Sequence, residues 1–247
     1  MANGLKNAEC LEYLDLQYNG MEDRHGDTVC KIIKEQYAHK GALRWRLGLR
    51  NGEYFNISTI GLKSINLSKN NFGDKFISQL AETLSTDEYV KCIALKQNNI
   101  GPKGFKMITN IAADHRSLLS MDMRNNPGFE ESEDCNEIMK YGFLKNIRAA
   151  IRKYYNDGTR IKLEWIYPNA LGQYDNQLDE MQPAMDPQPN RELFVKLIQE
   201  ISDNIEIPFN LVTKAIIGAK SENQNKLRRK IIDVFDQVKS DGIARSR

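Results

Sequence analysis

The sequence is short of the residues that most metal and catalytic sites need. Its 247 residues include four cysteines that lie far apart without a C-x-x-C pair, and three isolated histidines. This spacing gives little support to a disulfide framework or a zinc site. No G-x-S-x-G, P-loop or G-x-G-x-x-G motif is present. We therefore expect no catalytic residue, no metal ligand and no cofactor, in a protein that is not an enzyme.

Long apolar runs and a charge excess are missing too. No apolar run approaches the roughly 20 residues that cross a bilayer, and the first residues lack the core of a signal peptide. The net charge is +2 with 28% charged residues, which indicates neither a polyanion binder nor an acidic solvating chain. The sequence predicts a soluble intracellular protein with no membrane and no nucleic-acid partner.

What the sequence does contain is a repeat. The pattern L-x-x-L-x-L-x-x-N occurs three times, and 28 residues separate both Asn70 from Asn98 and Asn98 from Asn126. A further copy runs from Leu11 to Asn19. The template and its period are those of leucine-rich repeats. Its apolar positions alternate along a short strand and face a core, and the asparagine amide bonds the backbone where the strand ends.

These repeats predict an α/β fold, a leucine-rich-repeat solenoid with a curved parallel sheet and outer helices, followed by a small C-terminal helical region. Helical apolar spacings at 76–84 and 105–112 follow Gly73 and Gly101. No polar capping repeat precedes Leu11, although solenoid ends need covering. Either residues 1–10 improvise a cap, or another chain covers this end, or the sequence starts partway through a longer protein.

An insertion interrupts the repeats. The spacing from Asn19 to Asn70 is 51 residues, so about one repeat of 28 plus 23 extra residues separates them, and the excess lies near 37–60. Insertions in repeat proteins map to loops on one face, often the binding face. The Arg-Trp-Arg cluster around Trp45 has the composition of an interface hot spot. The alternative is that Trp45 fills a gap beside the solenoid while the arginines are solvated.

The C-terminal third predicts a cap, a linker and a tail. Residues 1–167 form the solenoid, of which 129–167 are the cap, with a helix over 135–155 and an edge strand from Ile161; a binding site is the alternative for this segment. The proline-rich stretch 168–190 predicts a linker. Three short helices in 191–247 make a marginal core. This tail therefore packs on a partner, on a second copy or on the solenoid.

The concave face is the predicted binding surface, because extended concave sheets are what solenoids use to hold other proteins. It mixes small, polar and singly charged residues and lacks the interleaved aromatics and dense basic residues of a nucleic-acid groove. The candidate partner-binding residues on this face and in the insertion are Tyr13, Asp15, Gln17, Asn66, Lys96, Asp122, Arg124 and Trp45.

The order of these features also carries a family resemblance. The chain resembles ribonuclease-inhibitor-type leucine-rich-repeat proteins and, more specifically, the family of the seventy-eight-kilodalton centrosomal protein. The segments that carry it are Leu11–Asn19, Arg44–Arg46, Gly61–Asn70, Leu84–Ile100, Met121–Pro127 and Trp165–Pro168. The resemblance implies a component of centrioles and ciliary basal bodies that acts in cilium assembly and binds a ubiquitin-ligase complex.

We therefore expect a non-enzymatic protein-binding scaffold of the centriole, basal body or ciliary axoneme, located in the cytoskeleton. Two alternatives stay open at this point. One is an inhibitor-like regulatory module that occupies a partner enzyme through the same face. The other is a structural subunit that its assembly holds mainly by the ends of the chain.

Overall fold

The computed structural model describes residues 2–5, 8–51, 60–158, 161–162, 165–166, 198–203 and 205–217. The chain divides into two compact units, Met1–Asn146 and Ile147–Arg247. Among the described residues, no helix has the length and apolar character that spanning a membrane requires.

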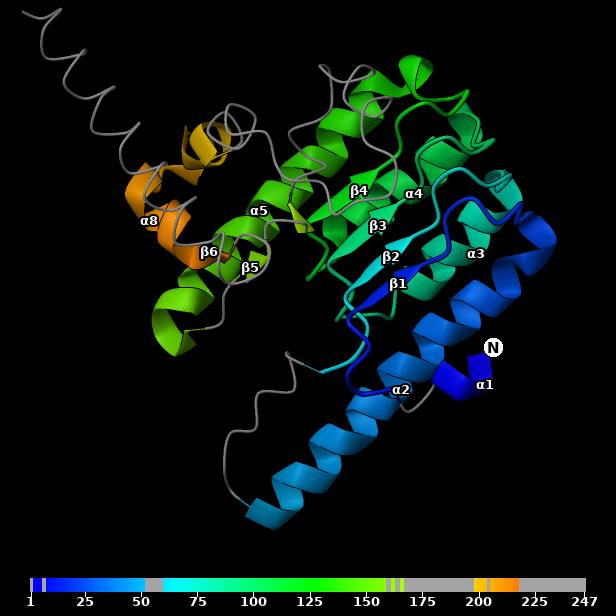
Figure 1. Cartoon of the computed structure of the whole chain (residues 1–247). Helices are drawn as coiled ribbons and strands as arrows, with labels where there is room; N and C mark the ends of the chain where they lie inside the picture. The colour runs from blue at the N-terminus through cyan, green and yellow to red at the C-terminus, as the bar shows by residue number, and fades with distance from the viewer. Residues whose placement is uncertain are drawn as a thin grey trace, which may run out of the picture. The chain divides into compact units, whose positions relative to one another are not determined.

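The first unit is a mixed α/β structure built around a parallel sheet. The four strands follow chain order from one edge to the other, and helices cover one face of the sheet (Figure 1). The strands are β1 (Tyr13–Asp15), β2 (Ser64–Asn66), β3 (Cys92–Ala94) and β4 (Ser120–Asp122). The helices are α1 (Ala2–Leu5), α2 (Gly26–Asn51), α3 (Asp74–Leu84), α4 (Pro102–Asp114) and the part of α5 (Glu133–Asp157) up to Asn146, with short 3-10 turns at Asp23–His25 and Glu130–Ser132.

The strand register reproduces the spacing of the sequence repeat. Tyr13 pairs with Ser64, Ser64 with Cys92, and Cys92 with Ser120. The apolar residues between the sheet and the helices form one buried cluster, which includes Ile65, Ile93, Phe76 and Phe105. The predicted helices after Gly73 and Gly101 are confirmed, and both glycines are the N-cap residues of their helices.

The regularly spaced asparagines form a series of hydrogen bonds between repeats in the structure. We call Asn19, Asn70, Asn98 and Asn126 the asparagine ladder. Asn98 Oδ1 accepts from the backbone N–H of Phe72 at 3.1 Å, and its Nδ2 donates to the carbonyls of Leu95 and Leu67 at 2.9 and 3.1 Å. The amides of Asn70, Asn98 and Asn126 thus bond the backbone where the strand ends, as the pattern predicts, and each also bonds a carbonyl of the preceding repeat.

A left-handed residue precedes each asparagine of the ladder. Tyr18, Lys69, Gln97 and Asn125 have φ between 53° and 57°. A non-glycine residue in this conformation costs roughly 1–2 kcal/mol. The buried side-chain bonds of the neighbouring asparagine offset that cost, because they satisfy the backbone groups that the turn leaves without partners.

An aspartate makes a second link between repeats. Asp23 Oδ1 accepts from Gly73 N–H at 2.7 Å, and Asp74 Oδ1 accepts from Gly101 N–H at 2.8 Å. Each aspartate lies four residues after a ladder asparagine, at the start of the helix. Its charge therefore also complements the positive end of the helix dipole.

The insertion differs from the loop that the sequence predicts. Residues 37–51 continue α2, which extends past the strands as one helix of 26 residues (Figure 1). The extension is helical because Gln36 and Lys40 bond the backbone of Leu62, as described below, and because Leu43 is buried. Residues 52–59 of the insertion lie outside the described residues.

The second unit contains a small sheet of its own. Strand β5 (Ile161–Lys162) pairs in parallel with β6 (Ile216–Ile217), which follows helix α8 (Phe209–Ala215). The predicted strand at Ile161 is therefore present and pairs with β6, while the role of this segment as a cap of the repeats stays a prediction. β5 takes a partner from the last third of the chain, which no local pattern indicates.

The apolar residues of this unit, such as Ile161, Ile201 and Val212, are buried. Residues 198–203 are helical, in agreement with the first predicted helix of the tail. The proline-rich linker at 168–190 and the third tail helix lie outside the described residues.

The asparagine ladder yields a stability prediction. Asn98→Ala removes bonds to two buried carbonyls and one buried N–H, so we expect a loss of roughly 3 kcal/mol or more in the free energy of unfolding. Asn19→Ala, at the exposed first position of the ladder, is the matched control and should cost less than about 1 kcal/mol. Urea unfolding followed by far-UV circular dichroism measures both; equal losses would contradict the role of the ladder.

Candidate functional site

The first group of predicted binding residues forms a polar network on β1 and β2. Asn66 Nδ2 donates to Gln17 Oε1 at 3.1 Å and lies 3.4 Å from the Tyr13 hydroxyl. The Tyr13 hydroxyl donates to Asp15 Oδ2 at 3.3 Å. Tyr13, Asp15 and Gln17 are exposed, and Asn66 is partly exposed. These four side chains are brought together and can offer donors and acceptors to a partner.

The environment of Tyr13 keeps its hydroxyl protonated. Burial of part of the ring, followed by the nearby Asp15 carboxylate, raises the pKa of Tyr13 to about 12. The side chain therefore presents a neutral hydroxyl and an aromatic ring, a combination that is common at protein interfaces.

The second group, on β3 and β4, is buried. Lys96 and Asp122 are only 7% and 8% exposed. Arg124 grips Asp122 with two hydrogen bonds, Nε to Oδ1 at 2.9 Å and a terminal guanidinium nitrogen to Oδ2 at 2.7 Å. A bidentate pair of this kind fixes both side chains in one geometry. These residues therefore offer little surface to a partner in this conformation.

The remaining candidate, Trp45, is separate from both groups. It lies on the extension of α2, it is 73% exposed, and its neighbours Arg44 and Arg46 are exposed as well. The reading in which Trp45 fills a gap beside the repeats does not match this exposure. Helix α2 projects beyond the strands (Figure 1), and Trp45 belongs to its last ten residues.

A buried polar cluster anchors the extension of α2 to the repeats. Lys40 Nζ donates to the Leu62 carbonyl at 2.9 Å, and Gln36 Oε1 accepts from Leu62 N–H at 3.3 Å. Gly61 has φ +67°, and a Cβ there would come within 2.6 Å of Lys40 Cε. The close approach of helix and strand at this point thus requires glycine.

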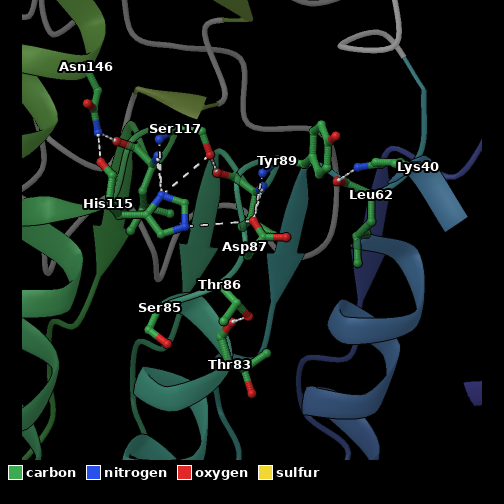
Figure 2. Close-up of polar contacts among 12 residues, drawn as sticks. Lys40, Leu62, Thr83, Ser85, Thr86, Asp87, Tyr89, His115, Ser117 and Asn146 are labelled. Atoms are coloured by element: carbon green, nitrogen blue, oxygen red, sulfur yellow. Dashed lines mark hydrogen bonds and ion pairs between the residues drawn. The ribbon is translucent and has the colours of Figure 1, made fainter. Parts of the chain in front are cut away.

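Two buried lysines share one aromatic ring in this cluster. Lys40 Nζ lies 4.6 Å from the centre of the Tyr89 ring (Figure 2). Lys63 Nζ lies 5.5 Å from the same centre, and both lysines are 1% exposed. Burial lowers the pKa of Lys40 to about 8. Burial, followed by the charge of Lys40, lowers the pKa of Lys63 to about 7. Two ammonium groups cannot both be well accommodated here, so the cluster limits stability at neutral pH.

Asp87, His115 and Ser117 lie together and have the residue types of a hydrolase catalytic triad, but they hydrogen-bond to backbone groups. His115 Nε2 lies 3.8 Å from Asp87 Oδ1, and its Nδ1 lies 3.5 Å from the Ser117 hydroxyl (Figure 2). However, Nδ1 accepts from the backbone N–H groups of Ser117 and Leu118 at 3.1 and 3.0 Å, and the Ser117 hydroxyl donates to Val90 O at 2.8 Å. The imidazole is therefore not placed to take the serine proton.

Asp87 and His115 accept the same pair of backbone hydrogen bonds in successive repeats. Asp87 Oδ1 accepts from the N–H groups of Tyr89 and Val90 at 2.8 and 2.7 Å, two and three residues ahead, as His115 Nδ1 does 28 residues later. Burial lowers the pKa of His115. The neutral ring with its proton on Nε2 satisfies both backbone donors and directs that proton toward Asp87.

The sequence analysis did not predict the bonds from Gln36 and Lys40 to Leu62, nor the backbone bonds of Asp87 and His115. The repeat spacing could have indicated the second pair, since Asp87 and His115 are 28 residues apart. An aspartate and a histidine at matching positions, however, are not recognised as one repeated residue type. The lysines were hidden because charged residues are normally assigned to the surface.

The fold and the contacts between repeats are those of a leucine-rich-repeat protein. The chain matches the family model of a leucine-rich repeat over residues 7–24, which contain β1 and the first asparagine of the ladder. The chain therefore carries leucine-rich repeats, as its parallel sheet, helices and asparagine ladder show.

Particular relatives follow from the sequence. The chain is 26% identical to "Centrosomal protein of 78 kDa" from Mus musculus over 155 residues, which are 62% of this chain and 19% of the relative. It is 25% identical to the Homo sapiens protein of the same name, over 62% of this chain and 22% of that protein. The chain resembles these proteins and spans about a fifth of their length.

One solved structure has a similar backbone. It is "Leiomodin-1 Actin-Binding Site 2 (ABS2)", with a TM-score of 0.42, 12% sequence identity, and coverage of 74% of this chain and 95% of that one. A TM-score of this size does not bear on the function of the chain.

The lysine pair predicts a pH dependence of stability. An unfolded lysine titrates near 10.5, whereas folding lowers the pKa of Lys63 to about 7, so the unfolded state binds more protons between these values. Stability should therefore rise with pH through this window. Lys63→Met should raise the melting temperature most at pH 7, and the gap to the natural protein should narrow toward pH 10. Lys75→Met, at an exposed position of α3, is the control.

From the lowered pKa of His115 we predict that the protein loses stability at acidic pH. Its folded pKa lies below the ordinary value of 6.5, so the unfolded state takes up the proton first and stability falls as the pH drops below about 6.5. His115→Asn keeps an acceptor at the same position and cannot titrate. Its melting temperature should therefore depend less on pH between 6.5 and 5; an unchanged pH dependence would contradict the role given to His115.

Proposed function

We propose that the chain is a leucine-rich-repeat solenoid that acts as a non-enzymatic protein-binding scaffold of the centriole, basal body or ciliary axoneme. The setting is supported by the resemblance to the centrosomal protein over 62% of this chain. The binding role is carried by one observation, the exposed Trp45 on a helix that is firmly anchored at its root.

Trp45 has the properties of an interface anchor. A tryptophan that is 73% exposed keeps a large apolar area in water, and covering it with a partner is favourable by about 25 cal/mol for each Å² removed from water. Tryptophan and arginine are enriched among the residues that dominate binding energy. Arg44 and Arg46 stand beside it and complement a carboxylate-rich partner.

The anchor of α2 makes this contact efficient. Three contacts hold the helix five to nine residues before Trp45: the bonds of Lys40 and Gln36 to Leu62, and the ring contact of Tyr37 with Tyr89 at 5.7 Å between centroids. A side chain on a rigid helix loses less conformational freedom on binding than one on a loop. The helical form of the insertion therefore favours a binding role more than the loop that the sequence predicts.

The polar network on β1 and β2 supplies a second contact. Tyr13, Asp15, Gln17 and Asn66 are already oriented by bonds to one another, and they set specificity by the donors and acceptors they present. Lys96 and the Asp122–Arg124 pair shape the sheet from within and do not touch the partner. The binding surface is thus the β1–β2 part of the sheet face predicted from the sequence, together with Trp45.

The test uses the full chain, tagged and expressed in ciliated cells. We expect enrichment at centrioles or basal bodies, and we expect Trp45→Ala to lose most of that enrichment because a hot-spot tryptophan contributes about 2 kcal/mol or more. Tyr141→Ala is the matched control, since Tyr141 is 77% exposed on α5 in the same unit. Quantitative imaging against a centriole marker measures the fraction retained.

Two outcomes would count against the proposal in different ways. A diffuse natural protein would contradict the centriolar setting. Retention of Trp45→Ala at the level of Tyr141→Ala would contradict the contact, provided that both variants keep the melting temperature of the natural protein.

A further inference from the structure

The outer face of the α2 extension is apolar although it is exposed to water. Small residues and one tryptophan recur there at the spacing i, i+3, i+4 and i+7, which places them on one face of a helix. We call them the outer stripe: Ala38, Gly41, Ala42 and Trp45. All are exposed, Trp45 by 73%, and a Cβ added at Gly41 would meet no atom within 4 Å. The described part of the chain therefore leaves this face uncovered.

The outer stripe lies on the side of α2 that faces away from the repeats. The inner side is marked by the buried residues Gln36, Lys40 and Leu43. Two of them bond the backbone of Leu62. Trp45 follows Gln36 by about two and a half helical turns, so these two side chains leave opposite sides of the helix. The extension thus has an inner face that packs on the repeats and an outer face that no described residue covers.

Gly41 indicates which shape of partner the outer stripe accepts. Glycine is, after proline, the least favourable residue in a helix interior, and no described neighbour gives it a steric reason here. Small residues on a helix face let a second helix approach closely, because the distance between two helix axes depends on the side chains at the contact. Trp45, one turn further on, supplies a large side chain that can fill a hole between side chains of that second helix. The outer stripe therefore fits a helix.

The charge of the extension has one sign. Residues 36–51 contain no aspartate or glutamate, and their basic residues are Lys40, Arg44, Arg46 and Arg50. The first half of α2 differs, because its exposed Lys34 lies 3.8 Å from a carboxylate oxygen of Glu82. No described carboxylate forms an ion pair with Arg44 or Arg46. The extension therefore attracts a partner that carries carboxylates.

The two arginines border the outer stripe on both sides. Arg44 and Arg46 are the chain neighbours of Trp45, so their side chains leave the helix about 100° to either side of the indole. A partner helix that lies along the stripe would bring each of its flanks beside one arginine. Flanking glutamates of coiled-coil helices pair with basic residues in this way. The arrangement therefore favours a partner with carboxylates on both flanks of an apolar seam.

We propose that the outer stripe binds an acidic amphipathic helix of another protein, whose flanking carboxylates pair with Arg44 and Arg46. The inference rests on the proposed role of Trp45 and names the partner of that contact. A second copy is disfavoured, because two outer stripes would bring arginines against arginines. A membrane is disfavoured as well, because helices that lie in a membrane surface bury several large apolar residues and the outer stripe has one.

The probe is a labelled synthetic peptide of about three heptads, with leucine at positions a and d, glutamate at e and g, and alanine elsewhere. Repulsion between the glutamates keeps this acidic peptide from pairing with itself at neutral pH. One control peptide carries lysine at e and g, and another has the residues of the acidic peptide in scrambled order. Fluorescence anisotropy with the full chain should show saturable binding of the acidic peptide and at least about tenfold weaker binding of both controls.

Gly41→Gln separates binding from folding. Glutamine is a better helix former than glycine and has room at this position, so the melting temperature should be unchanged or higher. The same side chain keeps a partner helix at a greater distance, so the acidic peptide should bind at least about tenfold more weakly. Ser78→Gln, at an exposed position of α3, is the matched control and should leave binding unchanged.

Arg46→Glu tests the charge of the partner. It should weaken binding of the acidic peptide and strengthen binding of the lysine peptide, and a loss of folding cannot produce both effects. Lys75→Glu, at an exposed position of α3, is the control and should change the binding of neither peptide.

Several results would overturn the proposal. They are the absence of saturable binding up to about 1 mM acidic peptide, equal binding of the lysine peptide, and unchanged binding by Gly41→Gln. A dimer of the natural chain that Gly41→Gln converts to monomer in sedimentation would assign the outer stripe to a second copy. Binding to phosphatidylserine vesicles that Trp45→Ala abolishes would assign it to a membrane.

The peptide assay and the imaging of the tagged chain can fail separately. Peptide binding that Trp45→Ala weakens, in a chain that is diffuse in cells, would contradict the centriolar setting alone. Enrichment at centrioles that depends on Trp45, in a chain that does not bind the acidic peptide, would contradict the helical partner alone.

Discussion

The asparagine ladder is the constraint on which the first unit depends. A repeat of 28 residues must turn sharply at the end of each strand, and the turn requires a left-handed residue and leaves several backbone groups without a partner in the strand. One amide side chain resolves both problems, since Asn98 and Asn126 each bond their own strand end and the backbone of the preceding repeat. Repeats joined this way have no independent stability, because every amide needs its neighbour.

This dependence also explains where the molecule can interact. Interior repeats satisfy their backbone and cover their apolar residues, so their sheet face holds buried pairs such as Asp122–Arg124. Among the described residues, β1 is an edge strand of the sheet, Asn19 is exposed, and the leucines of this repeat are partly exposed. The α2 extension adds a second available element, because the bonds from Gln36 and Lys40 to Leu62 fix its root while Trp45 stays exposed.

Sequence reasoning succeeded where one residue type repeats at a fixed spacing. The asparagines, the strand leucines and the glycines before α3 and α4 predicted the parallel sheet and its helices. It failed where function is shared by unlike residues, as with Asp87 and His115, or where a long-range contact overrides a local signal. The rule that insertions map to loops suggested a loop at 37–60, but bonds from Gln36 and Lys40 to Leu62 hold a helix over residues 37–51. The strand at Ile161 was predicted, but not its partner Ile216, which is 55 residues away.

Amide hydrogen exchange of the full chain, resolved by residue, tests the central claim most directly. The account predicts slow exchange at Phe72 and Asn98, whose N–H groups the ladder holds. It predicts fast exchange at Tyr13 and Asp15, because β1 is an edge strand and no described residue bonds their N–H groups on the side away from β2. Protection at Tyr13 and Asp15 equal to that at Phe72 in the isolated chain would contradict an open edge. Fast exchange at Phe72 and Asn98 would contradict the ladder itself.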